Sequence, residues 1–176
     1  RRVERAAGLT SAVDLAPTLL AIHGAGEPPE SMTGKSLTNL LAGDGEHHDA
    51  VLYGYFTREV NMTDGRYTYH RAGADGSTVH RHFTSYHGMS AEKVAAGELG
   101  AHLKWCKGYP HFRIAMPSTR SADLPGDRVI YDLAADPGQS RPVRDEALDR
   151  RLAELMKRKL EAAAAPQCQF DRLGLA

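Results

Sequence analysis

Apolar residues recur at every third or fourth position near the carboxyl end of the chain, with polar residues between them. This spacing predicts an amphipathic helix over residues 145–163, because it lines up one apolar stripe along a helix. Acidic residues stand in the first turn of this segment and basic residues near its end, as the helix dipole favours. The stripe consists of Leu148, Leu152, Leu155, Met156, Leu160 and Ala163. We expect this helix to bury one face.

From residue 51 onward the pattern changes to short runs that alternate in polarity and are rich in aromatic and β-branched residues. Such runs are typical of strands. Asp64 and Gly65 separate two of them, and this dipeptide is a strong hairpin signal. A second turn, over residues 73–77, leads into the next strand. The pattern therefore predicts an antiparallel meander.

Two further strands are predicted at residues 111–116 and 128–133, where the sequences HFRIAM and RVIYDL stand. Between the meander and these strands, the alanine-rich stretch over residues 90–105 favours a helix, although Gly97 and Gly100 interrupt it. After the long amphipathic helix, we expect a loose tail.

Two short helices are predicted before residue 50. Ser11 and Asp14 have the spacing of a capping box, and Gly24 can close the first helix in the left-handed conformation. The second helix is expected within the sequence KSLTNLLAG, where Leu37, Leu40 and Leu41 share one face. The sequence GDGEHHD that follows reads as an exposed loop.

Together these elements predict an α+β fold, in which a small antiparallel sheet of about four strands packs against the C-terminal amphipathic helix. The chain has 176 residues, 22 basic and 22 acidic side chains. A formal charge of zero favours neither nucleic acid nor an acidic membrane surface as a partner. Its two cysteines, Cys106 and Cys168, are too few and too far apart for a disulfide scaffold or a cysteine zinc site. No apolar run is long enough to span a membrane and no signal segment is visible, so the location stays open between cytoplasm and periplasm.

Three stretches follow one another along the chain: SAVDLAPTLLAIHG, GKSLTNLLAG and YDLAADPGQSRPV. In this order they resemble segments of the sulfatase family, which belongs to the alkaline phosphatase superfamily. The resemblance implies that residues 1–49 contribute edge helices and a loop to the large sulfatase α/β domain. It also implies that residues 50–165 form the C-terminal subdomain of antiparallel sheet plus helix, with residues 166–176 as a tail.

By this resemblance, the chain is the C-terminal portion of an arylsulfatase-like enzyme that hydrolyses sulfuric esters. Sulfatases use a formylglycine, made from the cysteine of a Cys-x-Pro-x-Arg segment, and a calcium ion. Both would lie in the preceding part of the enzyme, so we expect no catalytic residue, metal ligand or cofactor in this segment and no activity from it alone. The sequence CQFDR at residues 168–172 is similar to the cysteine segment, but Phe170 replaces the proline.

The expected role is to shape the substrate pocket, with Arg66, His70, Arg71, His80 and His82 as candidate pocket residues. The histidines gather within a short stretch of chain, at positions 70, 80, 82, 87, 102 and 111. His80 and His82 share one side of a strand, a spacing that can hold a transition metal, yet no carboxylate or thiolate nearby supports a metal site. Solvent-facing histidines on an open sheet are the plainer interpretation.

The expected partners are the rest of the sulfatase polypeptide, with its N-terminal catalytic domain, and a small sulfate ester. Whether the protein forms a homo-oligomer stays open. Two alternatives remain: a stand-alone binding or assembly module built from this subdomain, and a piece of a related phosphatase or phosphonate hydrolase. A piece of a larger enzyme should expose the apolar side of its first helix, whereas a module should not.

Overall fold

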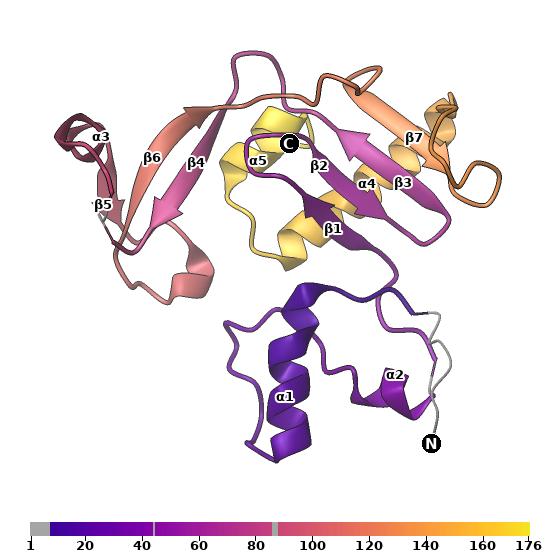
Figure 1. Cartoon of the computed structure of the whole chain (residues 1–176), viewed down its shortest axis with the longest axis horizontal. Helices are drawn as coiled ribbons and strands as arrows, with labels where there is room; N and C mark the ends of the chain where they lie inside the picture. Colours follow the sequence, from indigo (N-terminus) through magenta and orange to yellow (C-terminus); the bar gives the residue numbers. More distant parts are fainter. Residues whose placement is uncertain (1–7, 44, 86–87) are drawn as a thin grey trace.

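The computed structural model describes residues 8–43, 45–85 and 88–176. It is an α+β structure with two antiparallel sheets, a short helical segment at the N-terminal end and two helices at the C-terminal end (Figure 1). The predicted fold class is therefore confirmed. Among the described helices, none is long and apolar enough to cross a membrane.

The first sheet has four strands in the order β1-β2-β3-β7, all antiparallel. Its strands are β1 (Val51–Gly54), β2 (Val60–Thr63), β3 (Tyr67–Arg71) and β7 (Arg128–Asp132). The predicted hairpin joins β2 to β3, where Gly65 takes a φ of 89° and the Asp64 carboxylate accepts the amides of Arg66 and Tyr67. Both the four-stranded sheet and the turn at Asp64 and Gly65 agree with the sequence pattern.

Helix α4 (Glu146–Ala162) lies along one face of this sheet (Figure 1). The Asp145 carboxylate caps it by accepting the amides of Ala147 and Leu148. Its buried residues are Leu152, Leu155, Met156 and Leu160, all from the predicted stripe. They form one core with Met62, Tyr69 and Ile130 of the sheet, so the predicted helix and its buried face are confirmed.

The expected loose tail is wrong. Residues 167–173 form helix α5 (Gln167–Leu173), and the side chains of Phe170, Leu173 and Leu175 are buried in the same core as α4. In the sequence, polar residues and a glycine separate these three apolar residues, so no apolar stripe can be recognised there. Burial of three large apolar groups explains why the segment is ordered.

The expected meander is also wrong beyond β3. Strand β7 occupies the free edge of β3, so the next strand, β4 (Thr78–Phe83), pairs instead with β6 (His111–Pro117). A second sheet results, with the order β4-β6-β5.

The helix expected over residues 90–105 is reduced to one short helix, α3 (Ala91–Ala95). It is followed by β5 (Glu98–Gly100) and a single 3-10 turn, η2 (Lys104–Cys106). Gly97 explains the change, since a Cβ atom at this position would lie 2.0 Å from the Phe112 ring. This close approach lets the chain leave the helix and pair with β6.

The N-terminal segment contains a 3-10 turn, η1 (Ala12–Asp14), followed by α1 (Leu15–His23) and α2 (Thr38–Ala42). Ser11 and Asp14 form the predicted capping box, and Gly24 closes α1 with a φ of 62°. In Figure 1, α1 and α2 stand apart from the two sheets, next to the chain that leads into β1. Leu40 of α2 is buried, but Leu41 is 54% exposed, so the shared apolar face predicted for α2 is only partly buried.

Candidate functional site

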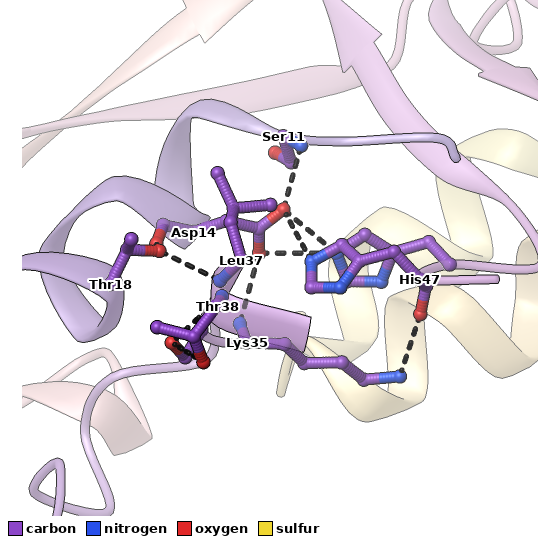
Figure 2. Close-up of polar contacts among 9 residues, drawn as sticks. Ser11, Asp14, Thr18, Lys35, Leu37, Thr38 and His47 are labelled. Carbon is purple, nitrogen blue, oxygen red and sulfur yellow. Dashed lines mark hydrogen bonds and ion pairs between the residues drawn. The ribbon is translucent and has the colours of Figure 1, made fainter. Parts of the chain in front are cut away.

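Among the described residues before β1, Asp14 is the most buried charged residue, with 0% of it exposed. Its Oδ2 atom accepts the amide of Ser11 at 2.8 Å, and its Oδ1 atom accepts the amide of Lys35 at 2.9 Å. Figure 2 shows this carboxylate at the centre of converging donors from separate parts of the chain. Asp14 therefore links the start of the helical segment to the loop before α2.

The neighbouring Thr18 extends this network. Its hydroxyl group donates to the main-chain oxygen of Asp14 and accepts the amide of Leu37 at 2.9 Å, beside the start of α2 (Figure 2). Gly34 makes the approach sterically feasible, because a Cβ atom at that position would lie 2.0 Å from the main-chain oxygen of Val13. Hydrogen bonds thus join the start of α1 to the start of α2.

Two imidazole rings complete the surroundings of the Asp14 carboxylate. The Nε2 atom of His48 lies 3.1 Å and 3.0 Å from the two carboxylate oxygens, within hydrogen-bond distance. The Nε2 atom of His47 lies 3.2 Å from Oδ2 of Asp14, but it has no hydrogen-bond partner among the described residues. The side chains of His47 and His48 are only 7% and 13% exposed. The loop that the sequence predicted to be exposed therefore turns both histidines inward.

The rings of His47 and His48 meet edge to face, with centroids 4.4 Å apart. Lys35 fixes the loop from the other side, since its Nζ atom donates to the main-chain oxygen of His47 at 3.3 Å (Figure 2). Leu9 also forms an antiparallel bridge with His48. Local contacts thus hold both rings toward the carboxylate.

Burial raises the pKa of the Asp14 carboxyl group, but the amides of Lys35 and Ser11 and the ring of His48 lower it by more. The net pKa lies below the ordinary value of an aspartate. Asp14 is therefore ionised at neutral pH, and its negative charge faces two imidazoles. One carboxylate oxygen and two imidazole nitrogens lie within 4.8 Å of one another, an arrangement that could hold a metal ion.

A second group of histidines gathers on the three-stranded sheet. The ring centroid of His82 lies 6.5 Å from that of His80, 6.3 Å from that of His102 and 5.0 Å from that of His111. The structure thus adds His102 and His111 to the pair that the sequence singled out. His87 lies outside the described residues.

The histidine cluster of the sheet favours neutral imidazoles. Burial, together with the neighbouring His111, His80 and His102, lowers the pKa of His82 to about 4. Burial and Arg113 also lower the pKa of His80. Neutral rings in an edge or tilted arrangement pack without mutual repulsion, so we read this cluster as packing.

The candidates Arg66 and Arg71 have other partners. Arg71 is buried, and its guanidinium group donates to the main-chain oxygens of Leu173 and Gly174 and to the hydroxyl group of Tyr69. Arg66 forms an exposed ion pair with Asp132 at 3.2 Å. The donors of Arg71 thus hold the C-terminal segment in place. Its expected part in a substrate pocket stays a prediction.

His70 stands on the sheet face opposite Tyr69, between the rings of Tyr53 and Tyr131. Burial lowers its pKa, while Gln139 and Glu59 act in the opposite direction. The candidates Arg66, His70 and Arg71 share one hairpin, whereas His80 and His82 belong to the second sheet. The structure therefore places the five candidates on two different sheets.

An open groove of about 300 Å³ lies between the β1–β2 loop, β4 and α5. Its aromatic wall is formed by Tyr53, Tyr55 and Phe56, all of them at least 43% exposed. Of the five candidate residues, His80 lines this groove. Such an aromatic wall can stack on a flat or sugar-like group.

No protein-family model matches this chain, and no curated protein matches it. The sequence interpretation missed the group formed by Asp14, His47 and His48, since its partners come from separate motifs. The paired histidines and the acidic position of the capping box were visible, but 34 residues separate Asp14 from His48. No short spacing pattern connects them.

Proposed function

We propose that the chain is the C-terminal part of a sulfatase-like enzyme, in which it forms one wall of the substrate pocket. The order of three motifs supports this proposal: SAVDLAPTLLAIHG, then GKSLTNLLAG, then YDLAADPGQSRPV, each resembling a sulfatase segment. The arrangement of a four-stranded antiparallel sheet with a C-terminal helix is also what that resemblance implies.

The observation that carries the proposal is the exposed apolar face of α1. Leu15, Leu19 and Ile22 follow one another at helical spacing, and they are 58%, 56% and 59% exposed. Val13, just before the helix, is 52% exposed. A stripe of this kind normally faces a core, so an uncovered one points to a missing partner surface.

The opposite side of α1 strengthens this argument. Pro17 and Thr18 are buried there, and Thr18 and Asp14 contact the segment around α2 through hydrogen bonds. The side of α1 that carries Pro17 and Thr18 thus makes the contacts within the described residues, and the apolar stripe on its other side is left uncovered. An uncovered apolar stripe fits a helix that packs on the sheet of a larger α/β domain.

In the complete enzyme, formylglycine and calcium would supply the nucleophile and the charge neutralisation, and both belong to the other part of the polypeptide. This segment would contribute the groove that contains Tyr53, Tyr55, Phe56 and His80. Its aromatic side chains would contact the alcohol portion of the sulfate ester, which is where substrates of one reaction class differ.

The experiment is to recover the full reading frame around this sequence, express its product and measure hydrolysis of 4-nitrophenyl sulfate. The expected product contains a Cys-x-Pro-x-Arg segment, hydrolyses the sulfate and loses activity when that cysteine becomes alanine. Cys168→Ala is the matched control and should keep full activity. Preferred hydrolysis of 4-nitrophenyl phosphate or a phosphonate ester would overturn the sulfatase assignment. A short frame whose product is monomeric and unfolds cooperatively would instead support a stand-alone module.

A further inference from the structure

We propose that Asp14, His47 and His48 form a binding site for a divalent transition metal ion of the Zn²⁺ class. The three side chains come from η1 and from the loop before β1, and the cluster lies outside the groove that contains His80. The metal site and the sulfatase relationship are independent, because either can hold without the other.

The distances between the ligand atoms suit a metal ion of this size. With bonds of about 2.0–2.2 Å, two ligand atoms of a tetrahedral Zn²⁺ site lie roughly 3.3–3.5 Å apart. The Nε2 atoms of His47 and His48 lie 3.2 Å and 3.0 Å from Oδ2 of Asp14. These two distances lie within a few tenths of an ångström of those values, and all three ligand atoms lie within 4.8 Å of one another, which leaves the fourth position of the ion for water.

The burial of the His47 side chain is a second observation that supports a metal site. Its side chain is 7% exposed and its Nε2 atom lies inside the cluster, yet this nitrogen has no hydrogen-bond partner within the described ranges. A buried polar atom without a partner is costly, and native structures normally satisfy such atoms. A metal ion would satisfy this nitrogen through its lone pair.

The donor set selects the kind of metal. Two imidazole nitrogens and one carboxylate oxygen suit Zn²⁺, Co²⁺ or Ni²⁺, whereas Ca²⁺ requires six or more oxygen ligands. The calcium ion that the sulfatase resemblance implies would therefore not fit here. Binding places the metal on Nε2 of each ring, and any proton carried there is released to solvent.

The metal would fasten two parts of the chain to each other. Asp14 lies at the end of η1, directly before α1. His47 and His48 lie in the loop that leads into β1. A bond from each side to one ion would fix how α1 is held relative to the four-stranded sheet. The site thus has a structural role, and catalysis is not required of it.

The test is to titrate the metal-free chain with Zn²⁺ and to follow binding by calorimetry and by competition with a chelating dye. Co²⁺ in place of Zn²⁺ gives a visible absorption spectrum that reports tetrahedral coordination. We expect one equivalent of Zn²⁺ to bind, a higher unfolding temperature with the metal than without it, and no comparable binding of Ca²⁺. The absence of Zn²⁺ binding in the micromolar range, or tighter binding of Ca²⁺, would overturn the proposal.

Four variants locate the site. His47→Gln removes a ligand without removing a ring hydrogen bond, so the metal-free protein should stay folded while Zn²⁺ affinity falls about 10-fold or more. His48→Gln should weaken binding at least as much. His23→Gln, at the exposed end of α1, and His82→Gln, in the other histidine cluster, should bind Zn²⁺ as the parent does. Unchanged binding by both His47→Gln and His48→Gln, or loss of binding in His82→Gln, would contradict the assignment.

Discussion

The Nε2 atom of His47 lies 3.2 Å from Oδ2 of Asp14 and forms no hydrogen bond with it. The same carboxylate accepts amides from Ser11 and Lys35 and contacts the ring of His48. Asp14 therefore connects three parts of the chain, which are the start of the helical segment, the loop before α2 and the loop before β1. The capping role that the sequence indicates is only one part of its function.

Replacing Asp14 by asparagine should loosen this segment. An amide side chain has one acceptor oxygen, so it cannot accept the amides of both Ser11 and Lys35 as the carboxylate does. Leaving one buried donor without a partner costs about 1–3 kcal/mol. In the Asp14→Asn variant, hydrogen exchange should accelerate at the amides of Ser11 and Lys35, while amides in α4 keep their protection. Unchanged exchange at both amides would show that the carboxylate is not their main support.

Polar substitutions on the exposed face of α1 should affect association more than stability. Leu19 and Ile22 are each more than half exposed, so changing both to serine should alter the free energy of unfolding by no more than about 0.5 kcal/mol each. The parent chain should self-associate in sedimentation experiments, and the double variant should be monomeric. Leu40→Ser is the matched control, because Leu40 is buried and its loss should destabilise the fold. A parent chain that stays monomeric at all concentrations would argue against an uncovered contact surface.

Helix α5 should be essential to the stability of the core. Phe170 is buried against the same cluster as Leu152 and Met156, so Phe170→Ala should lower the free energy of unfolding by about 3–5 kcal/mol. Gln167→Ala, on the exposed side of the same helix, should cost less than about 0.5 kcal/mol. Urea unfolding of the three proteins provides the comparison. Equal stability of the two variants would mean that α5 contributes little to the core.

Those elements of the fold could be predicted whose residue pattern lies within one short stretch of sequence. The stripe from Leu148 to Ala163 predicts α4, and Asp64 with Gly65 predicts the β2–β3 hairpin, because spacing within a short window determines both. The pairing of β7 with β3 was not predictable in this way. It depends on contacts between strands far apart in the sequence, and it forces β4 into a second sheet.

The candidate site was less predictable than the fold. Capping by Asp14 could be predicted from four consecutive residues. The inward orientation of His47 and His48 could not, because it depends on the bridge from Leu9 and on the hydrogen bond from Lys35. Likewise, Arg71 was expected among the pocket residues, and its donors are accepted by carbonyl oxygens at the end of the chain. Sequence patterns identify residue chemistry, and distant parts of the chain decide which partners satisfy it.

The histidine cluster of the second sheet should make the protein sensitive to mild acid. Burial and the facing rings of His111, His80 and His102, followed by Arg113, lower the pKa of His82 from 6.5 to about 4. The folded state thus disfavours a proton on His82 that the unfolded chain accepts readily. The resulting stability is fully present above pH 6.5 and is lost as the pH falls through about 4.

The measurement is the free energy of unfolding in urea as a function of pH between these two values. The His82→Gln variant should lose less stability than the parent over this window, because glutamine does not titrate. His23→Gln should follow the parent curve, since His23 is exposed and lies outside the cluster. In proton NMR, the His82 ring should titrate well below the ordinary histidine range. A parallel decline in His82→Gln and in the parent would place the acid sensitivity in other groups, such as His70 and His80, whose pKa values burial also lowers.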